Sequence, residues 1–254
     1  MWATKDFTMI KKAFLLCFMF VSMVQVTFAS VDYVNYKATF GIFGTVGTIN
    51  NKITKNKNTY EIESKVTVLG LAKVMLDGHT EKHISKGRMV SGLMISDFYQ
   101  SIQKSENKTI SKEYHINHKK KYVTKRERKW KYGKLVKDKK QRLNFYAKDD
   151  LLTLYFNLGV AVKKKGKTYK FKAVGLEKQN GIVYVTVPSQ KNVTPYVTDL
   201  GEGASLYAKA VIKQKNFKNK KGDILLSLSK DSYIEKSVIK DVLLYGDAKI
   251  ERVR

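Results

Sequence analysis

One short apolar segment, residues 144–160, stands in the middle of a chain that otherwise has the residue pattern of β-strands. It reads NFYAKDDLLTLYFNLGV. Asp149 or Asp150 is a good helix N-cap, because a short carboxylate accepts hydrogen bonds from the free N–H groups of a first helical turn. Gly159 can adopt the left-handed backbone that commonly ends a helix. The sequence therefore predicts one short helix, over about 150–158.

The apolar side chains of this helix fall all round its axis and leave no polar face. Such a helix belongs inside a core. The flanking sequence alternates polar and apolar residues with the period of a strand, most clearly over 59–69. Many strands run longer than the usual length of about five or six residues, which favours a coiled, barrel-like sheet. We therefore predict a mainly β fold: a single large antiparallel, coiled, open-barrel-like sheet with one short buried helix.

Glycines and an Asn-Gly pair mark the turns, because glycine adopts positive φ angles without steric cost. The segment 187–204 lacks periodicity and holds both prolines, so we expect a long loop there. We find no internal repeat or linker, and expect a single domain over 30–254. The expected turns are 41–47, 70–72, 86–88, 131–134, 179–181, 218–222 and 230–231.

The first 29 residues have the pattern of a secretory signal peptide. Three lysines precede an apolar run over 13–26, and Thr27-Phe28-Ala29 places small residues at the −3 and −1 positions of a cleavage site. We expect cleavage after Ala29 and export; the alternative is an uncleaved N-terminal anchor. Cys17, the only cysteine, would leave with the signal, which removes disulfide and thiolate chemistry from the mature chain. Export without disulfides favours a bacterial periplasm.

The chain is strongly basic, with a formal net charge of +27. Without residues 1–29, which hold three lysines and one aspartate, 46 basic and 21 acidic residues remain, a net of +25. Six of the basic residues are arginine, and this excess of lysine is typical of an AT-rich genome, so part of the charge can arise from codon bias. A charge of this size attracts polyanions. Outside the cytoplasm these are lipopolysaccharide, anionic phospholipid and acidic glycans, so we expect no nucleic-acid partner.

Several short, glycine-led motifs occur in a fixed order over roughly 33–253. They are Tyr36 with the run 41–47 (GIFGTVG), 68–71 (VLGL), 85–87 (SKG), 91–93 (SGL) leading to Tyr99, 149–152 (DDLL) and 243–247 (LLYGD). In these motifs the chain resembles the domain-of-unknown-function family numbered 3108, a group of exported bacterial proteins. The resemblance implies an antiparallel open barrel, a periplasmic location and no established activity.

That architecture is broadly similar to the lipoprotein-localisation carriers, which hold acyl chains in a half-barrel closed by helices. The similarity is an analogy of fold alone. By this analogy, we expect an apolar cavity between helix 150–158 and the sheet. Its expected lining residues are Leu151, Leu154, Tyr155 and Leu158.

Residue patterns for metal binding or catalysis are weak. His79 and His83 flank Glu81, but on a strand the two histidines lie about 13 Å apart along the chain, too far to share one ion. Asp149 and Asp150 are more simply helix caps than an acid–base pair. No Gly-x-Ser-x-Gly or phosphate-binding glycine loop occurs. We therefore predict no enzyme, no metal site and no cofactor.

The segment 117–142 is the strongest candidate for a charged surface. It holds thirteen Lys or Arg against Glu127 and Asp138, and aromatic residues alternate with them. Such a hairpin can contact an anionic membrane surface peripherally. The alternative is a solvated edge hairpin whose lysines prevent edge-to-edge pairing. The candidate contact residues are Lys119, Lys120, Lys121, Lys125, Arg126, Arg128, Lys129, Trp130 and Lys131.

The sequence thus favours a non-enzymatic periplasmic binding protein with an apolar half-barrel that handles envelope lipid or lipoprotein. The alternative hypothesis is a basic scaffold protein of the cell envelope that binds lipopolysaccharide or acidic glycan through its surface. A cavity beside the central helix distinguishes the first hypothesis from the second.

Overall fold

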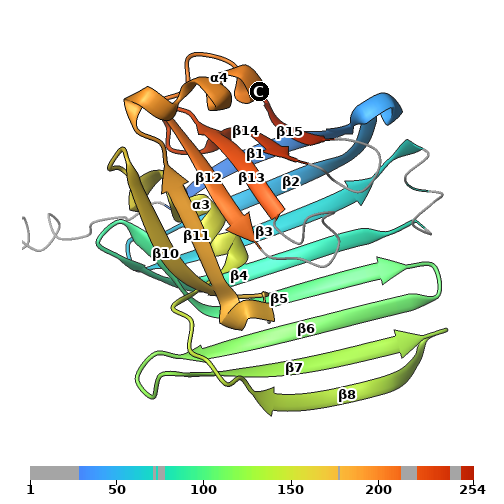
Figure 1. Cartoon of the computed structure of the whole chain (residues 1–254). Coiled ribbons are helices and arrows are strands. Elements are labelled where there is room, and N and C mark those ends of the chain that lie inside the picture. Colours follow the sequence, from blue (N-terminus) through green and yellow to red (C-terminus); the bar gives the residue numbers. More distant parts are fainter. Residues whose placement is uncertain (1–28, 71–72, 74–77, 177, 213–221, 241–246) are drawn as a thin grey trace, which may run out of the picture.

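The computed structural model describes residues 29–70, 73, 78–176, 178–212, 222–240 and 247–254. Fifteen strands in this part of the chain form one sheet (Figure 1). The order is β8-β7-β6-β5-β4-β3-β2-β1-β15-β14-β13-β12-β11-β10-β9. The predicted fold class, mainly β with a large, mostly antiparallel open sheet, is confirmed. The predicted signal peptide falls almost entirely outside the described residues.

The N-terminal half is a meander of eight strands, each hydrogen-bonded antiparallel to the next. A 3₁₀ turn, η1 (Gly41–Phe43), joins the first two strands at the expected glycine corner. The strands are β1 (Ser30–Phe40), β2 (Thr45–Lys55), β3 (Thr59–Val68), β4 (Thr80–Val90), β5 (Leu93–Ser105), β6 (Lys108–Asn117), β7 (Tyr122–Lys131) and β8 (Lys134–Arg142).

The C-terminal half returns to the first strand, since β15 pairs with β1. These strands cross in front of the N-terminal meander, with the central helix α3 (Leu151–Ala161) between the two layers (Figure 1). The parallel pair β9–β10 departs from the otherwise antiparallel pairing. The strands are β9 (Asp149–Asp150), β10 (Lys167–Val174), β11 (Ile182–Val187), β12 (Leu206–Ile212), β13 (Gly222–Leu228), β14 (Ile234–Ile239) and β15 (Ala248–Val253).

The central helix is buried, as predicted, but it ends later than expected. Asp150 is its N-cap and accepts a hydrogen bond from the backbone N–H of Thr153. Gly159 lies inside the helix, which continues to Ala161, so the predicted C-cap is wrong. A Cβ at Gly159 would lie 2.2 Å from the backbone oxygen of Ser232. The glycine is therefore needed for close packing against the 229–233 turn, and not for a left-handed helix end.

A similar correction applies to the expected turn at 86–88. Gly87 lies within β4 at a bulge in its pairing with β5, and the turn itself falls at Ser91-Gly92, which both have positive φ. A Cβ at Gly87 would lie 2.0 Å from the backbone oxygen of Ile95. Here too the glycine permits a close approach of two backbones. The turns at Tyr132-Gly133 and Asn180-Gly181 are confirmed, while parts of the expected turns 70–72 and 218–222 fall outside the described residues.

The predicted loop 187–204 is partly helical. It contains a 3₁₀ turn, η3 (Gln190–Asn192), and a short helix, α4 (Thr194–Leu200). Pro195 occupies the first turn of α4, where a missing N–H costs nothing. The absence of periodicity in this segment thus concealed a short helix. No helix in the described ranges is long and apolar enough to span a membrane.

Candidate functional site

The N-terminal end of α3 is fixed to the inner face of the sheet by a buried hydrogen-bond network. The Asp150 carboxylate accepts from the Ser85 hydroxyl at 2.6 Å and from the Thr153 hydroxyl at 2.8 Å. The Tyr60 hydroxyl lies 2.7 Å from that of Thr153 and 3.0 Å from that of Ser85. Burial raises the pKa of Asp150 despite these bonds. The predicted capping role of Asp150 is confirmed, and this network extends it to β3 and β4.

Its neighbour Asp149 is held in a different way. Burial, and then the nearby charge of Asp150, raise the pKa of Asp149 to about 6. The buried Oδ1 atom of Asp149 has no hydrogen-bond partner in the described structure. The two carboxyl groups therefore differ in role: Asp150 caps and anchors the helix, whereas Asp149 is largely buried with one oxygen unpartnered.

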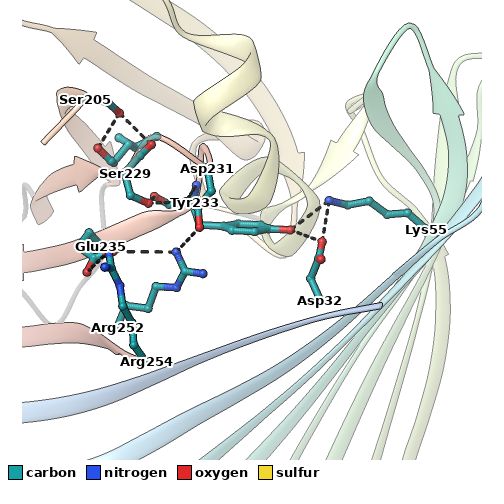
Figure 2. A network of polar contacts seen from close by, with 10 residues as sticks. Asp32, Lys55, Ser205, Ser229, Asp231, Tyr233, Glu235, Arg252 and Arg254 are labelled. Atoms are coloured by element: carbon teal, nitrogen blue, oxygen red, sulfur yellow. Dashed lines mark hydrogen bonds and ion pairs between the residues drawn. The ribbon is translucent and has the colours of Figure 1, made fainter. Parts of the chain in front are cut away.

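The C-terminal half of α3 is held by the opposite wall of the fold. Figure 2 shows Tyr233 pointing toward Asp32 and Lys55, which come from β1 and β2. The Tyr233 hydroxyl donates to the Asp32 carboxylate at 2.6 Å, and the Lys55 ammonium lies 3.3 Å from the same carboxylate. The Tyr233 ring packs edge-on against Phe156, with centroids 6.0 Å apart. The helix is thus fixed at its N-terminal end by hydrogen bonds and at Phe156 by this ring contact, so its position over the sheet is defined.

A cavity of about 270 Å³ lies between the first half of α3 and the inner face of the sheet. Its walls are mainly apolar, with a few polar side chains on β2, β3 and β4. The lining residues are Tyr36, Ile49, Asn51, Ser64, Val66, His83, Tyr99, Leu151, Leu152, Tyr155, Phe156 and Ile250.

Two of the four predicted lining residues are in this cavity. Leu151 and Tyr155 are four positions apart, share one helix face and line it. Leu154 and Leu158 share a different face and pack in the core against β10–β14, away from the cavity, so their prediction is wrong. The helix is apolar all round, and its sequence therefore did not show which face borders empty space.

A polar chain begins in the wall of the cavity at Tyr99 and His83 and continues away from it to Glu81 and His79. His83 lies with Nδ1 3.0 Å from the Tyr99 hydroxyl and Nε2 3.1 Å from the Glu81 carboxylate. The other oxygen of that carboxylate lies 2.7 Å from Nε2 of His79. Burial opposes the charge of Glu81, but the hydrogen bonds from His83 and His79 outweigh it and lower the pKa of its carboxyl group to about 2.

Sequence reasoning missed this chain. On sequence grounds, His79 and His83 were considered only as ligands of one shared metal ion. In the structure, the Glu81 carboxylate lies between the two rings and is within hydrogen-bond distance of both. Alternation placed all three residues on one face of the strand, and that signal could have identified the cluster. The described residues contain no grouping of three or more His, Cys, Asp or Glu side chains arranged to hold a metal ion.

The predicted basic surface does not form one patch. Lys119, Lys120 and Lys121 lie at the β6–β7 turn, whereas Trp130 and Lys131 lie at the far end of β7. About ten residues of strand separate the two groups, roughly 30 Å.

Several of the other candidates are already paired or buried. Lys125 is buried and lies 3.3 Å from the Glu127 carboxylate. Arg126 binds Asp138 through two hydrogen bonds, of 2.8 and 2.5 Å. Arg128 pairs with Glu113, and its guanidinium lies 5.7 Å from the centre of the Trp130 ring. Of the nine candidates, the lysines of the β6–β7 turn and Lys131 are the exposed ones without an ion pair in the described structure.

Comparison with known proteins supplies no family for this chain. No family model matches, and no curated protein matches. Among solved structures it is similar to the crystal structure of a beta-barrel-like protein of domain of unknown function DUF1849 from Brucella abortus. The two are 8% identical, over 87% of this chain and 95% of the other, with a TM-score of 0.46. The resemblance to family 3108 stays a prediction, and the fold rests on the strand pairing of this chain itself.

Proposed function

We propose that this protein binds the alkyl chain of an envelope lipid or lipoprotein in the cavity under α3, without catalysing a reaction. The supporting observation is the cavity itself, enclosed on one side by apolar residues of α3 and on the other by the inner face of the sheet. A cavity of about 150 Å³ lined by aliphatic and aromatic side chains accepts benzene. On that scale, the present cavity, which is open to solvent on one side, has room for an alkyl segment of roughly ten carbon atoms.

The polar groups of the wall support binding rather than catalysis. His83 is the imidazole that lines the cavity, and both of its ring nitrogens lie within hydrogen-bond distance of Tyr99 or Glu81. A general base needs a free nitrogen within reach of the substrate proton. His83 is therefore poorly placed for that role, and a periplasmic carrier remains our preferred function.

The experiment that tests this proposal is mass spectrometry of lipid that co-purifies with the protein from the periplasm. The variant Val66→Phe places a larger side chain in the cavity wall, and Val136→Phe, at an exposed position of β8, is its matched control. We expect acyl lipid with the wild type and the control, and a strong loss with Val66→Phe at unchanged thermal stability. Equal recovery from all three, or none from the wild type, would contradict the proposal.

The basic scaffold remains a second candidate, because every residue of β8 is exposed. Its basic residues are Lys134, Lys137, Lys139, Lys140 and Arg142. The scaffold function needs no cavity, so the Val66→Phe variant would bind lipopolysaccharide as well as the wild type does.

A further inference from the structure

A row of polar side chains crosses the inner face of the sheet from the cavity to the exposed edge. Direct cross-strand partners lie on the same face of a sheet, about 4.8 Å from one strand to the next. The first three members of the row line the cavity, and the later members continue onto β5–β8. In register, the row is Asn51, Ser64, His83, Ser101, Lys112, Glu127 and Lys139.

Two lysines of this row, Lys112 and Lys139, make no ion pair in the described structure, and Lys112 is the one nearer to the cavity. It is half-buried. Its cross-strand partner Glu127 is already engaged: one carboxylate oxygen lies 3.3 Å from Lys125 and the other 2.6 Å from Lys137. The carboxylate nearest to Lys112 in the row is therefore shared by two other lysines.

The position of Lys112 relates it to the cavity. It lies two strands from His83, which is about 10 Å at the normal strand spacing. A lysine stem is long and flexible, and can lie along apolar surface while its ammonium group reaches a polar contact. The Tyr99 and Tyr114 rings, stacked with centroids 5.7 Å apart, form the adjacent apolar part of this face. An ammonium group at such a border has a stronger electrostatic attraction for an anion than one in bulk water.

We propose that the ligand of this cavity carries an anionic head group, a carboxylate or a phosphate, which lies on the polar row and pairs with Lys112. This inference rests on the proposed function, because it assumes that the alkyl tail occupies the cavity under α3. The head group then lies over Ser101 and Lys112, on the β5–β6 side of the cavity mouth. A hydrogen bond between an ammonium and such an anion is of the stronger, charge-assisted kind.

Calorimetric titration of the full-length mature protein with four ten-carbon ligands tests the head group. The ligands are decanoate, decyl phosphate, decan-1-ol and decyltrimethylammonium. We expect the two anions to bind at least about ten-fold more tightly than the alcohol, and the cation to bind most weakly. Binding of the anions should weaken with salt, whereas binding of the alcohol should not. The tighter of the two anions identifies the head group as carboxylate or phosphate.

Variants test the role of Lys112. Lys112→Gln should lower the affinity for the tighter anion roughly ten-fold and leave that for decan-1-ol unchanged. Lys112→Arg keeps the charge and should retain most of the affinity. The matched control is Lys140→Gln, because Lys140 is exposed and its register partner Arg126 lies on the other face.

The outcomes separate this inference from the proposed function. Equal affinity for decanoate and decan-1-ol, or equal effects of Lys112→Gln and Lys140→Gln, would overturn the anionic head group while leaving the cavity as an alkyl-chain site. Failure of all four ligands to bind the wild type would overturn both. If Lys112→Gln does not fold, the ligand series and the Lys112→Arg variant on their own still decide the question.

Discussion

Two strands of the N-terminal meander, β3 and β8, have very different surroundings. Under α3, the inner face of β3 is almost fully buried, with Tyr60 at 3% and Ile62 at 0% exposed. In contrast, every residue of β8 is exposed. β3 alternates apolar and polar residues, whereas β8 is polar throughout after Leu135 and Val136, so a strand of this meander forms with or without an apolar face. Whether that face becomes a core depends on what packs against it.

Charges are also held differently in the two regions. Under α3, the buried Asp150 carboxylate accepts hydrogen bonds from the Ser85 and Thr153 hydroxyls. On β7 and β8, exposed ion pairs such as Lys137 with Glu127 connect neighbouring strands. Exposed pairs contribute little to stability, because water and salt screen them. We therefore expect changes near α3 to affect folding and changes on β8 to affect it little.

The largest expected effect comes from Leu154→Asp. Leu154 is buried in the core against β10–β14, so the substitution places an unpaired carboxylate in an apolar site. The expected loss is several kcal/mol, on the order of the whole stability of a domain. Urea denaturation measures it, and Val136→Asp on β8 should change little. A loss below about 1 kcal/mol for Leu154→Asp would mean that α3 is not buried.

Asp149→Asn should stabilise the protein, and its effect should depend on pH. The folded state raises the pKa of Asp149 to about 6 from about 3.9 in an unfolded chain, so the folded state binds this proton more tightly. The resulting destabilisation is absent below about pH 4, grows as pH rises and is complete above about pH 6–7. We expect Asp149→Asn to gain about 1–3 kcal/mol at pH 7 and almost nothing at pH 4.

Denaturation of both proteins across this pH range checks the effect of Asp149→Asn. Asp150 keeps its own raised pKa, so some pH dependence should remain in the variant. Glu106→Gln, at an exposed turn between β5 and β6, serves as the control. A gain at pH 4 equal to that at pH 7 would show that charge is not the cause.

Gly159→Ala should destabilise the protein despite a better helix propensity. Alanine gains up to about 1 kcal/mol over glycine inside a helix. Its Cβ would lie 2.2 Å from the Ser232 backbone oxygen, and such overpacking costs about 1–3 kcal/mol. We expect a net loss of about 1–2 kcal/mol, measured as a lower melting temperature. A more stable variant would contradict the packing described, and Val136→Ala on β8 is the comparison at an exposed site.

The smallest expected effect tests the basic hairpin. Binding to anionic liposomes should fall by a similar amount when five hairpin lysines or five exposed lysines elsewhere are changed to Gln, because the hairpin lysines do not form one patch. A much larger loss for the hairpin variant, with a blue shift of Trp130 fluorescence, would restore the hairpin as a membrane-contact site. The first set is Lys119, Lys120, Lys121, Lys125 and Lys129; the second is Lys37, Lys57, Lys163, Lys170 and Lys172.

The site could be predicted in part. A helix apolar on all sides, next to long strands, implied a helix inside a sheet, and the analogy with the lipoprotein-localisation carriers suggested a cavity beside it. Leu151 and Tyr155 border the cavity beside the helix, whereas Leu154 and Leu158 pack in the core. When a helix is apolar on all sides, its sequence does not show which side faces the sheet and which side borders the cavity. The placement of His83 and Lys112 on one face depends on the register of β4, β5 and β6, which is a long-range property.

The sequence by itself determined the β-rich class, the central helix and the N-cap at Asp150, because these depend on local periodicity and on hydrogen bonds within a few residues. Only the tertiary structure shows why positions 87 and 159 need glycine. A Cβ at Gly87 or Gly159 would clash with the backbone of Ile95 or Ser232, respectively. The tertiary structure also decided that the charged segment 117–142 is spread over two turns and two faces. A strand carries side chains alternately to opposite sides over its whole length, so charge that is dense in sequence need not be dense in space.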